Sequence, residues 1–284
     1  MWILFAILNP LADATKGLFS KKASRNVDSL LISWFNNLIP FIVFSPFLFF
    51  IELKFNFNFF QALFISGFIN IIATILYHRA ISKGDISVVV PMLSFTPLYL
   101  LIISPIIIGE FPDLKGLTGI ILIVAGSYLL NINFNERNFL APLKSLFANK
   151  GTRYMLIVAF IYSISANYDK IGIEASSVIQ YIIFINLFVS AGTTAFLFLR
   201  KKFSYSLIKL EWKNLFLVGF ITTLGFVFHM MALSLTLVVY VIALKRTNGM
   251  ISVGLGYFFL NEKHTRERLI GTFIMFTGVL LIII

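Results

Sequence analysis

Cysteine is absent from the 284 residues of this chain, histidine occurs three times, and charged residues make up 12% of the sequence. The absence of cysteine excludes disulfides, thiol catalysis and cysteine-based metal sites. The three histidines are scattered, with no nucleophile triad, metal-ligand cluster or phosphate-binding glycine loop, which argues against an enzyme. We therefore expect no catalytic residue, no metal site and no cofactor. A soluble globular domain carries roughly 25% charged residues, so the scarcity of charge also argues against a soluble protein.

Hydrophobic residues make up 59% of the chain, and its mean hydropathy is +0.93. A bilayer core about 30 Å thick takes roughly 20 apolar residues per helix, so ten helices use about 200 residues and leave short connections. The sequence therefore predicts an all-α membrane protein with ten transmembrane helices. Charge clusters bound the apolar runs at residues 2–19, 30–51, 59–79, 86–109, 115–132, 154–173, 178–199, 212–234, 237–259 and 267–284.

Basic residues outnumber acidic ones by 23 to 12, which gives a formal net charge of +11. In a soluble protein this balance would suggest nucleic acid as a partner. Here the basic residues lie at the ends of apolar runs, where Lys and Arg mark the cytoplasmic face and contact anionic lipid headgroups. We therefore expect membrane lipids, and no nucleic acid, around an integral multi-pass protein in the cell membrane of a prokaryote. The sequence leaves the oligomeric state open and is compatible with a monomer.

An internal repeat divides the chain into two related halves. An offset of 152 residues aligns the last three predicted helices of each half without a gap, and it pairs Gly119 with Gly271 and Gly126 with Gly278. Because each half has five helices, an odd number, the two halves must cross the membrane in opposite directions. The sequence thus predicts two inverted five-helix repeats, an architecture that recurs in transporters.

The repeat also sets the expected domain boundaries. Residues 1–133 form the first repeat, and residues 154–284 form the second. The segment between them, residues 134–153, is the longest polar interruption of the chain but still contains apolar residues. We expect this segment to be an interfacial linker.

The fourth and ninth predicted helices are equivalent under the repeat, and both contain residues that interrupt helices. The alignment places Thr96-Pro97 opposite Asn248-Gly249. Prolines and small residues are ordinary in membrane helices when taken singly. Their coincidence in equivalent helices predicts a functional bend in both. The interrupting residues are Pro91, Pro97 and Pro105 in the fourth helix and Gly249, Gly254 and Gly256 in the ninth.

A Glu-then-Gly pattern follows both interrupted helices. Its first copy is Gly109-Glu110, Gly119 and Gly126, and its second copy is Asn261-Glu262, Gly271 and Gly278. Together with the preceding residues 90–97, this pattern resembles the ten-helix members of the drug/metabolite transporter superfamily that are built from two EamA-type repeats. The resemblance implies a central cavity lined by helices one, three, four, six, eight and nine, and transport of small metabolites by alternating access. We interpret both glutamates as structural, because a carboxylate there can bind free N–H groups of the next helix.

The ninth predicted helix carries the strongest functional signal, Lys245 and Arg246 near its middle, with Asn248 close to the face of Lys245. An ionisable side chain at the centre of a membrane helix costs about 2.5 to 3.5 kcal/mol on insertion scales. Arginine offers a planar fork and lysine a mobile point charge, which suits phosphate or carboxylate. We predict that this group binds the anionic part of a substrate; the alternative is a structural charge cluster. Residues 243–247 also resemble the segment with which sugar-phosphate translocators of the same superfamily hold phosphate, which implies an anion but not a sugar.

Lys16 and Lys170 occupy equivalent positions in the first and sixth predicted helices, which align at an offset of 154. We predict that both line one central cavity and bind substrate. For Lys16 the alternative is an i,i+3 ion pair with Asp13 on the same helix. Tyr77 and His229, another equivalent pair, are candidate hydrogen-bond donors to substrate, and the alternative is a bond to a neighbouring helix.

The leading hypothesis is a secondary transporter of a small anionic metabolite. Deep in the predicted helices cations outnumber anions, so a phosphate or carboxylate would balance the excess charge. The cations are Lys16, Lys170, Lys245 and Arg246, and the anions are Asp13 and Asp169. A second hypothesis is an exporter of cationic or zwitterionic metabolites or drugs, which needs one of these acids in mid-membrane. A third is a membrane scaffold or an enzyme acting on lipid-linked substrates, which the inverted repeat argues against.

Overall fold

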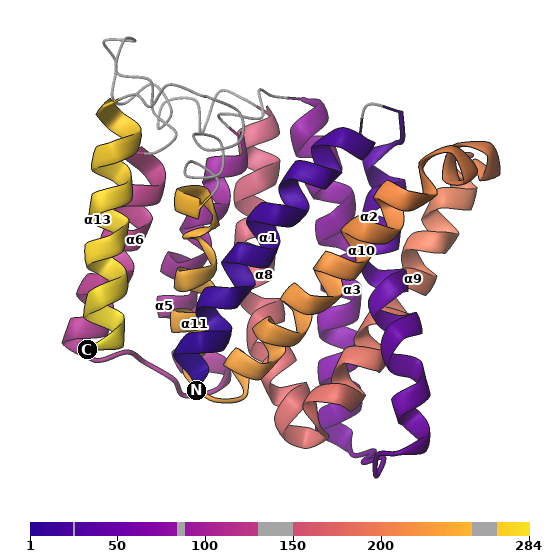
Figure 1. The fold of residues 1–284 in the computed structure, drawn as a ribbon. Helices are drawn as coiled ribbons and strands as arrows, with labels where there is room; N and C mark the ends of the chain where they lie inside the picture. Colours follow the sequence, from indigo (N-terminus) through magenta and orange to yellow (C-terminus); the bar gives the residue numbers. More distant parts are fainter. Residues whose placement is uncertain (25, 84–88, 130–149, 252–265) are drawn as a thin grey trace. The chain divides into compact units, whose positions relative to one another are not determined.

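The computed structural model of the chain describes residues 1–24, 26–83, 89–129, 150–251 and 266–284. Every regular element within these ranges is helical, and there are ten α-helices and two 3₁₀ helices among them (Figure 1). The all-α prediction is confirmed for this part of the chain.

The helices follow the predicted ranges in order. In the first sequence half they are α1 (Trp2–Ala23), α2 (Ser29–Phe44), η1 (Ser45–Phe49), α3 (Phe57–Ser82), η2 (Val90–Phe95), α5 (Thr96–Ile107) and α6 (Leu114–Leu129). In the second half they are α8 (Lys150–Ala175), α9 (Val178–Leu199), α10 (Tyr205–Leu233), α11 (Val238–Lys245) and α13 (Arg266–Ile283). The largest differences from the prediction are the earlier start of α10 and the earlier end of α11. Residues 252–259 of the predicted ninth helix lie outside the described residues.

Four of the described helical segments are long and apolar enough to cross a membrane. They are Ser29–Phe49, Phe57–Ser82, Val178–Leu199 and Tyr205–Leu233. Shorter apolar helices cover Met92–Ile107, Leu114–Leu129 and Ile270–Ile283. That all ten predicted helices cross the membrane stays a prediction.

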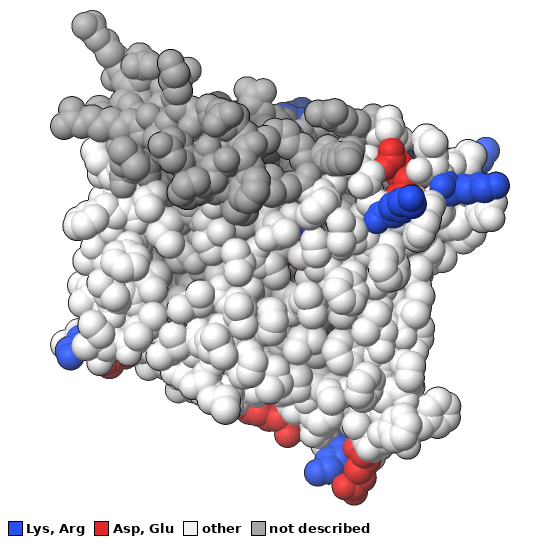
Figure 2. Space-filling view, in the orientation of Figure 1, with Lys and Arg blue, Asp and Glu red and all other residues white. Residues whose placement is uncertain are grey.

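The exposed side chains suit a lipid environment. On α3, Phe60, Phe64 and Phe68 are 43%, 48% and 57% exposed. The face drawn in Figure 2 carries few charged side chains among the described residues. Apolar surface of this extent would promote association in water. Lipid tails, which are as apolar as these side chains, solvate it instead.

The chain forms two compact units, and neither coincides with one sequence half. Unit 1 comprises residues 1–75 and 165–235, and unit 2 comprises residues 76–164 and 236–284. Two of the three boundaries between the units fall inside α3 and α8, and the third lies between α10 and α11. The predicted division into two sequence repeats concerns which residues are equivalent, not which residues pack together, and it stays a prediction.

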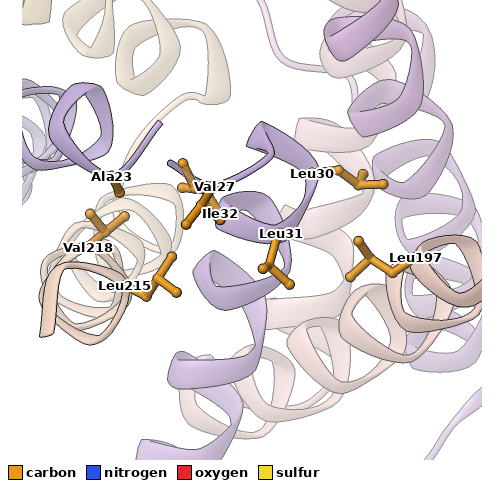
Figure 3. Packing of buried hydrophobic residues seen from close by; sticks show 8 residues of the cluster. All are labelled: Ala23, Val27, Leu30, Leu31, Ile32, Leu197, Leu215 and Val218. Carbon is orange, nitrogen blue, oxygen red and sulfur yellow. The ribbon is translucent and has the colours of Figure 1, made fainter. Parts of the chain in front are cut away.

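In unit 1, α1 packs along α10, and α2 packs against both α9 and α10. Buried side chains join these helices where α1 ends and α2 begins (Figure 3). The cluster comprises Ala23, Val27, Leu30, Leu31, Ile32, Leu197, Leu215 and Val218. Asp28 fixes the start of α2, because its Oδ1 accepts from the Leu30 N–H at 2.9 Å while its Oδ2 accepts from Lys202 Nζ at 2.6 Å.

In unit 2, α6 and α13 approach each other at glycines. A Cβ added to Gly119 would lie 2.7 Å from the carbonyl oxygen of Gly278, and one added to Gly278 would lie 2.6 Å from the carbonyl oxygen of Gly119. A Cβ added to Gly126 would lie 2.6 Å from the carbonyl oxygen of Gly271. The two helices are therefore antiparallel, with their backbones in contact, as small residues allow in membranes. The offset of 152 maps Gly119 onto Gly271 and Gly126 onto Gly278, so it exchanges these two contacts.

The loop between α5 and α6 forms hydrogen bonds with the start of α11. Glu110 Oε2 accepts from the Val238 N–H at 2.9 Å. Asp113 Oδ1 accepts from the Gly116 N–H at 2.8 Å and from the Tyr240 hydroxyl at 2.9 Å. The Gly116 N–H, followed by the Tyr240 hydroxyl, lowers the pKa of Asp113 below its ordinary value.

Glu110 was predicted to bind free N–H groups at a helix start, and its carboxylate binds the N-terminus of α11. Asp113, directly before α6, binds the N-terminus of that helix. The predicted structural role of Glu110 agrees with this contact. The counterpart Glu262 lies outside the described residues.

Candidate substrate site

The seven predicted site residues fall into two groups, one in each compact unit. Unit 1 contains Lys16, Lys170 and His229. Unit 2 contains Tyr77, Lys245, Arg246 and Asn248.

Both helices that the offset of 152 pairs in unit 2 are interrupted, and that these interruptions form a functional bend stays a prediction. The 3₁₀ helix η2 ends at Phe95, and α5 starts at Thr96. The other helix, α11, ends at Lys245, where the N–H groups of Arg246 and Thr247 bond to carbonyls three residues earlier, at 3.0 and 2.9 Å. Such i to i−3 bonds tighten and end a helix. Helical backbone resumes at Asn248.

One hydrogen bond joins the two interruptions. Arg246 Nη2 donates to Thr96 Oγ1 at 3.1 Å. Thr96 is 1% exposed, and its own hydroxyl proton goes to the Leu93 carbonyl at 2.7 Å. The start of α5 thus meets the end of α11, while Glu110, after α5, meets the start of α11 at Val238. These two repeat-equivalent helices therefore run antiparallel.

A tyrosine from a further helix lies near Arg246. Tyr162 on α8 is within electrostatic range of Arg246 and also of Tyr77 on α3. The two predicted site residues Tyr77 and Arg246 thus share Tyr162 as a neighbour in unit 2. Sequence reasoning missed Tyr162, because a lone tyrosine in an apolar helix carries no recognisable pattern. The sequence indicated Thr96 only because the offset of 152 aligns it with Asn248.

The two cations of α11 lie at a helix end, which contributes to their stability. Lys245 is in the last turn of α11, and Arg246 is the residue that follows. The partial negative charge at a helix C-terminus stabilises a cation by typically 0.3–1 kcal/mol. This offsets only part of the insertion cost of about 2.5 to 3.5 kcal/mol for each charge. The hydrogen bond to Thr96 supplies a further share for Arg246.

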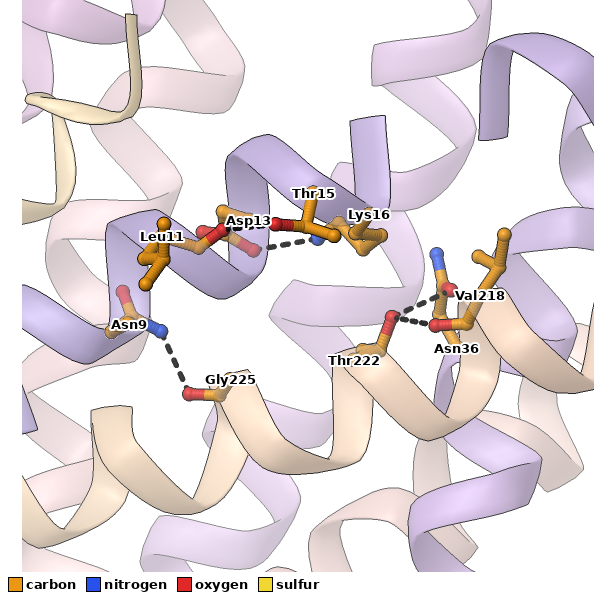
Figure 4. A network of polar contacts seen from close by, with 9 residues as sticks. All are labelled: Asn9, Leu11, Asp13, Thr15, Lys16, Asn36, Val218, Thr222 and Gly225. Atoms are coloured by element: carbon orange, nitrogen blue, oxygen red, sulfur yellow. Dashed lines mark hydrogen bonds and ion pairs between the residues drawn. The ribbon is translucent and has the colours of Figure 1, made fainter. Parts of the chain in front are cut away.

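In unit 1, Lys16 forms the i,i+3 ion pair that was named as its alternative. Lys16 Nζ donates to Asp13 Oδ1 at 2.7 Å, one turn away on α1 (Figure 4). The same view shows Asn9 Nδ2 reaching the Gly225 carbonyl on α10 at 2.7 Å. The ion pair neutralises Lys16 locally. A place for Lys16 beside a central cavity stays a prediction.

The predicted site residue Lys170 is 9% exposed, and its neighbour in the chain, Asp169, is 8% exposed. His229 is likewise buried in α10, at 6% exposure, one turn beyond Gly225. The predicted contacts of Lys170 and His229 with a substrate stay predictions. The same holds for Asn248, which follows the interruption of α11.

Asp169 lies at the end of a directed hydrogen-bond chain that sequence reasoning did not predict. Its Oδ1 accepts from the Ser66 hydroxyl on α3 and from the Tyr181 hydroxyl on α9, the latter at 2.9 Å. Because Ser66 has one proton and gives it to Asp169, the 2.9 Å contact between Ser66 and Ser165 must be donated by Ser165. Asn70 Nδ2 in turn donates to Ser165 at 2.7 Å. The hydroxyl protons of Ser165 and Ser66 thus point one after the other toward Asp169.

Two substitutions of Asp169 show whether its acceptor oxygen or its negative charge stabilises the fold. Asp169→Asn keeps an acceptor at Oδ1, whereas Asp169→Leu leaves the buried Ser66 and Tyr181 hydroxyls without this acceptor. A buried polar group that loses its partner costs about 1–3 kcal/mol. We expect the Leu variant to unfold at a clearly lower temperature than the Asn variant in thermal denaturation of the detergent-purified protein. Equal stability of the Leu variant and the wild type would contradict a structural role for this chain of bonds.

Comparison with known proteins identifies the family. The sequence profile of the EamA-like transporter family matches residues 1–132 and 149–284. The chain belongs to the EamA-like transporter family. Its resemblance to transporters built from two EamA repeats is thereby confirmed, and the chain is an integral membrane protein of a transporter family with small-molecule substrates.

The fold of this EamA-like transporter is also found among solved structures, of which 29 chains match. A crystal structure of another protein superposes with a TM-score of 0.78 at 14% sequence identity, over 99% of this chain and 95% of the other. At this identity the likeness concerns the fold alone. None of the curated proteins matches the sequence.

Proposed function

We propose that this EamA-like transporter carries a small anionic metabolite, bearing a phosphate or carboxylate, across the membrane by alternating access. The observation that carries the proposal is the position of Arg246. It follows the end of one interrupted helix and donates to Thr96 at the start of the other. Interrupted helices in corresponding positions of two repeats are where transporters of inverted-repeat architecture bind substrate. A guanidinium at that point favours an oxyanion.

The distribution of charge supports an anion. In unit 1, Lys16 is neutralised by Asp13 within α1. In unit 2, the acids whose side chains the structure describes are Glu110 and Asp113, both at the opposite end of α11 from Arg246. That helix has eight residues and is about 12 Å long. Lys245 and Arg246 thus place two cations at this end of α11.

Two pairs of helices support the proposal of an inverted repeat. The α6–α13 glycine contacts are exchanged by the offset of 152, which is the relation that a two-fold axis creates between identical partners. The α5–α11 pair, also equivalent under the offset, runs antiparallel. Antiparallel packing of equivalent helices is what two repeats of opposite orientation require. Movement of one repeat against the other would then expose the site alternately on the two sides.

The alternative of a cationic or zwitterionic substrate now depends on Asp169. Asp13 is held by Lys16, so Asp169 is the other acid that the sequence places deep in a helix. If the substrate is anionic, Arg246→Ala loses transport. If it is cationic or zwitterionic, Asp169→Asn loses transport.

Transport into proteoliposomes tests the proposal directly. The purified chain would be reconstituted and given labelled organic phosphates, carboxylates, amino acids and organic cations in turn. We expect accumulation or exchange of one or more anions, and no transport of compounds that carry only a positive charge. Transport confined to organic cations would contradict the proposal.

A further inference from the structure

Thr96 holds a special place in unit 2, because it begins α5 at the point where the two interrupted helices meet. It receives the Nη2 hydrogen bond of Arg246 across the two helices. It is almost fully buried, at 1% exposure. The equivalent residue of the second repeat is Asn248, directly after the interruption of α11. Both repeats thus place a polar side chain at the point where a helix restarts.

The hydroxyl of Thr96 is fixed by its own hydrogen bond. Its proton goes to the carbonyl of Leu93, the last turn of η2, at 2.7 Å. The same carbonyl accepts from the Thr96 backbone N–H, which closes the 3₁₀ helix. With the proton committed to Leu93, the oxygen presents a lone pair to Arg246. Thr96 is therefore oriented by η2 and acts on Arg246 as an acceptor.

A fixed acceptor restricts the guanidinium. Arginine has several rotatable bonds and loses conformational entropy when it is immobilised. A side chain that is already held in place loses less entropy when it binds a ligand, which raises the affinity. The guanidinium carries five N–H donors in a planar fork, so one bond to Thr96 orients the whole fork.

We propose that Thr96 is a positioning residue of the anion site, which holds Arg246 so that a bound anion lies at the junction of both interrupted helices. This inference rests on the proposed function, because it requires that Arg246 bind the anion. Thr96 itself acts through Arg246. The Thr96 hydroxyl bonds to Leu93 in η2 and to Arg246 after α11. An anion bound to Arg246 therefore acts on both interrupted helices.

Matched variants separate the hydroxyl from the volume of the side chain. Thr96→Val keeps the shape but removes the acceptor, and Thr96→Ala removes both, while Thr96→Ser restores the hydroxyl. Without the acceptor the guanidinium is less well positioned, and we expect the Kd for an anion to rise about tenfold. We expect Thr96→Ser to bind as the wild type does. Without ligand, Thr96→Val should melt below Thr96→Ser, because Arg246 loses an acceptor, so the two affinities are compared at a temperature at which both variants remain folded.

Calorimetric titration of the detergent-purified protein with inorganic phosphate, and separately with acetate, measures the effect. We expect heat of binding for at least one of these anions in the wild type, weaker binding in Thr96→Val and Thr96→Ala, and loss in Arg246→Ala. If Arg246→Ala loses binding while both hydroxyl-free variants bind as the wild type does, Thr96 is not a positioning residue and the proposed function stands. If Arg246→Ala binds both anions normally, or the wild type binds neither, the proposed function itself fails.

Discussion

Arg246→Ala is expected to abolish uptake of the anionic substrate into proteoliposomes while the protein remains folded and extractable. A guanidinium binds phosphate or carboxylate through paired N–H bonds, each worth roughly 1.5–3 kcal/mol when one partner is charged. Loss of two such bonds weakens binding by about a hundredfold or more. Folding should survive, because the sequence predicts that this helix crosses the membrane, and removal of a charge from such a helix also removes its insertion cost.

Two further substitutions make this result interpretable. Arg246→Lys keeps the charge but not the fork, and we expect it to transport far less than the wild type, since a point charge cannot make the paired contact. Arg200→Ala is the matched control, because Arg200 is exposed at the end of α9 and its guanidinium packs over Phe196. Normal uptake by Arg246→Ala would assign the Lys245–Arg246 pair to a structural charge cluster instead.

Gly278→Ala is expected to disrupt the α6–α13 pair, although it adds a single carbon atom. That atom would lie 2.6 Å from the carbonyl oxygen of Gly119 and 2.9 Å from the backbone nitrogen of Ile123. Backbone atoms of a packed helix cannot turn away as a flexible side chain can, so the two helices must separate. Overpacking of this kind costs typically 1–3 kcal/mol and occasionally more. We expect a large fall in the melting temperature and aggregation on size-exclusion chromatography.

Gly17→Ala supplies the control for this prediction. Gly17 lies within α1, and no atom lies within 4 Å of a Cβ added there. Alanine is favoured over glycine in a helix by about 1 kcal/mol, so this variant should melt at the same or a slightly higher temperature. If both alanine variants behave alike, the close approach of α6 and α13 does not limit stability.

The sequence predicted the helices well, because apolar runs between charges reflect the bilayer itself. The predicted range 178–199 coincides with α9, Val178–Leu199. The start of α10 was predicted too late, at residue 212, because Lys209 and Glu211 look like a loop. In the structure they are exposed or half-buried residues in the first turns of α10. Charge marks where a helix leaves the hydrocarbon, not where its hydrogen bonds end.

The candidate site was predicted in part, and the missing part depends on packing. Burial cost pointed to Lys245 and Arg246, and the repeat pointed to interruptions that the structure contains. The partner of Arg246 could not be read from the sequence, since an offset states which residues are equivalent and not which ones touch. Hydroxyl groups such as those of Ser66 and Tyr181 have no periodic signature. Their grouping around Asp169 follows from the register of three helices.

Unit 1 joins helices that are far apart in the sequence, so its early helices are synthesised before the partners they pack against. The helices α1 and α2 leave the ribosome long before α9 and α10, the helices they pack against, have been synthesised. A charged helix that waits for a distant partner is costly in the bilayer. The ion pair of Asp13 with Lys16 needs no partner beyond α1, so this helix can enter the membrane early. Asp169 is synthesised only after Ser66 on α3, one of the donors that hold it, has already been made.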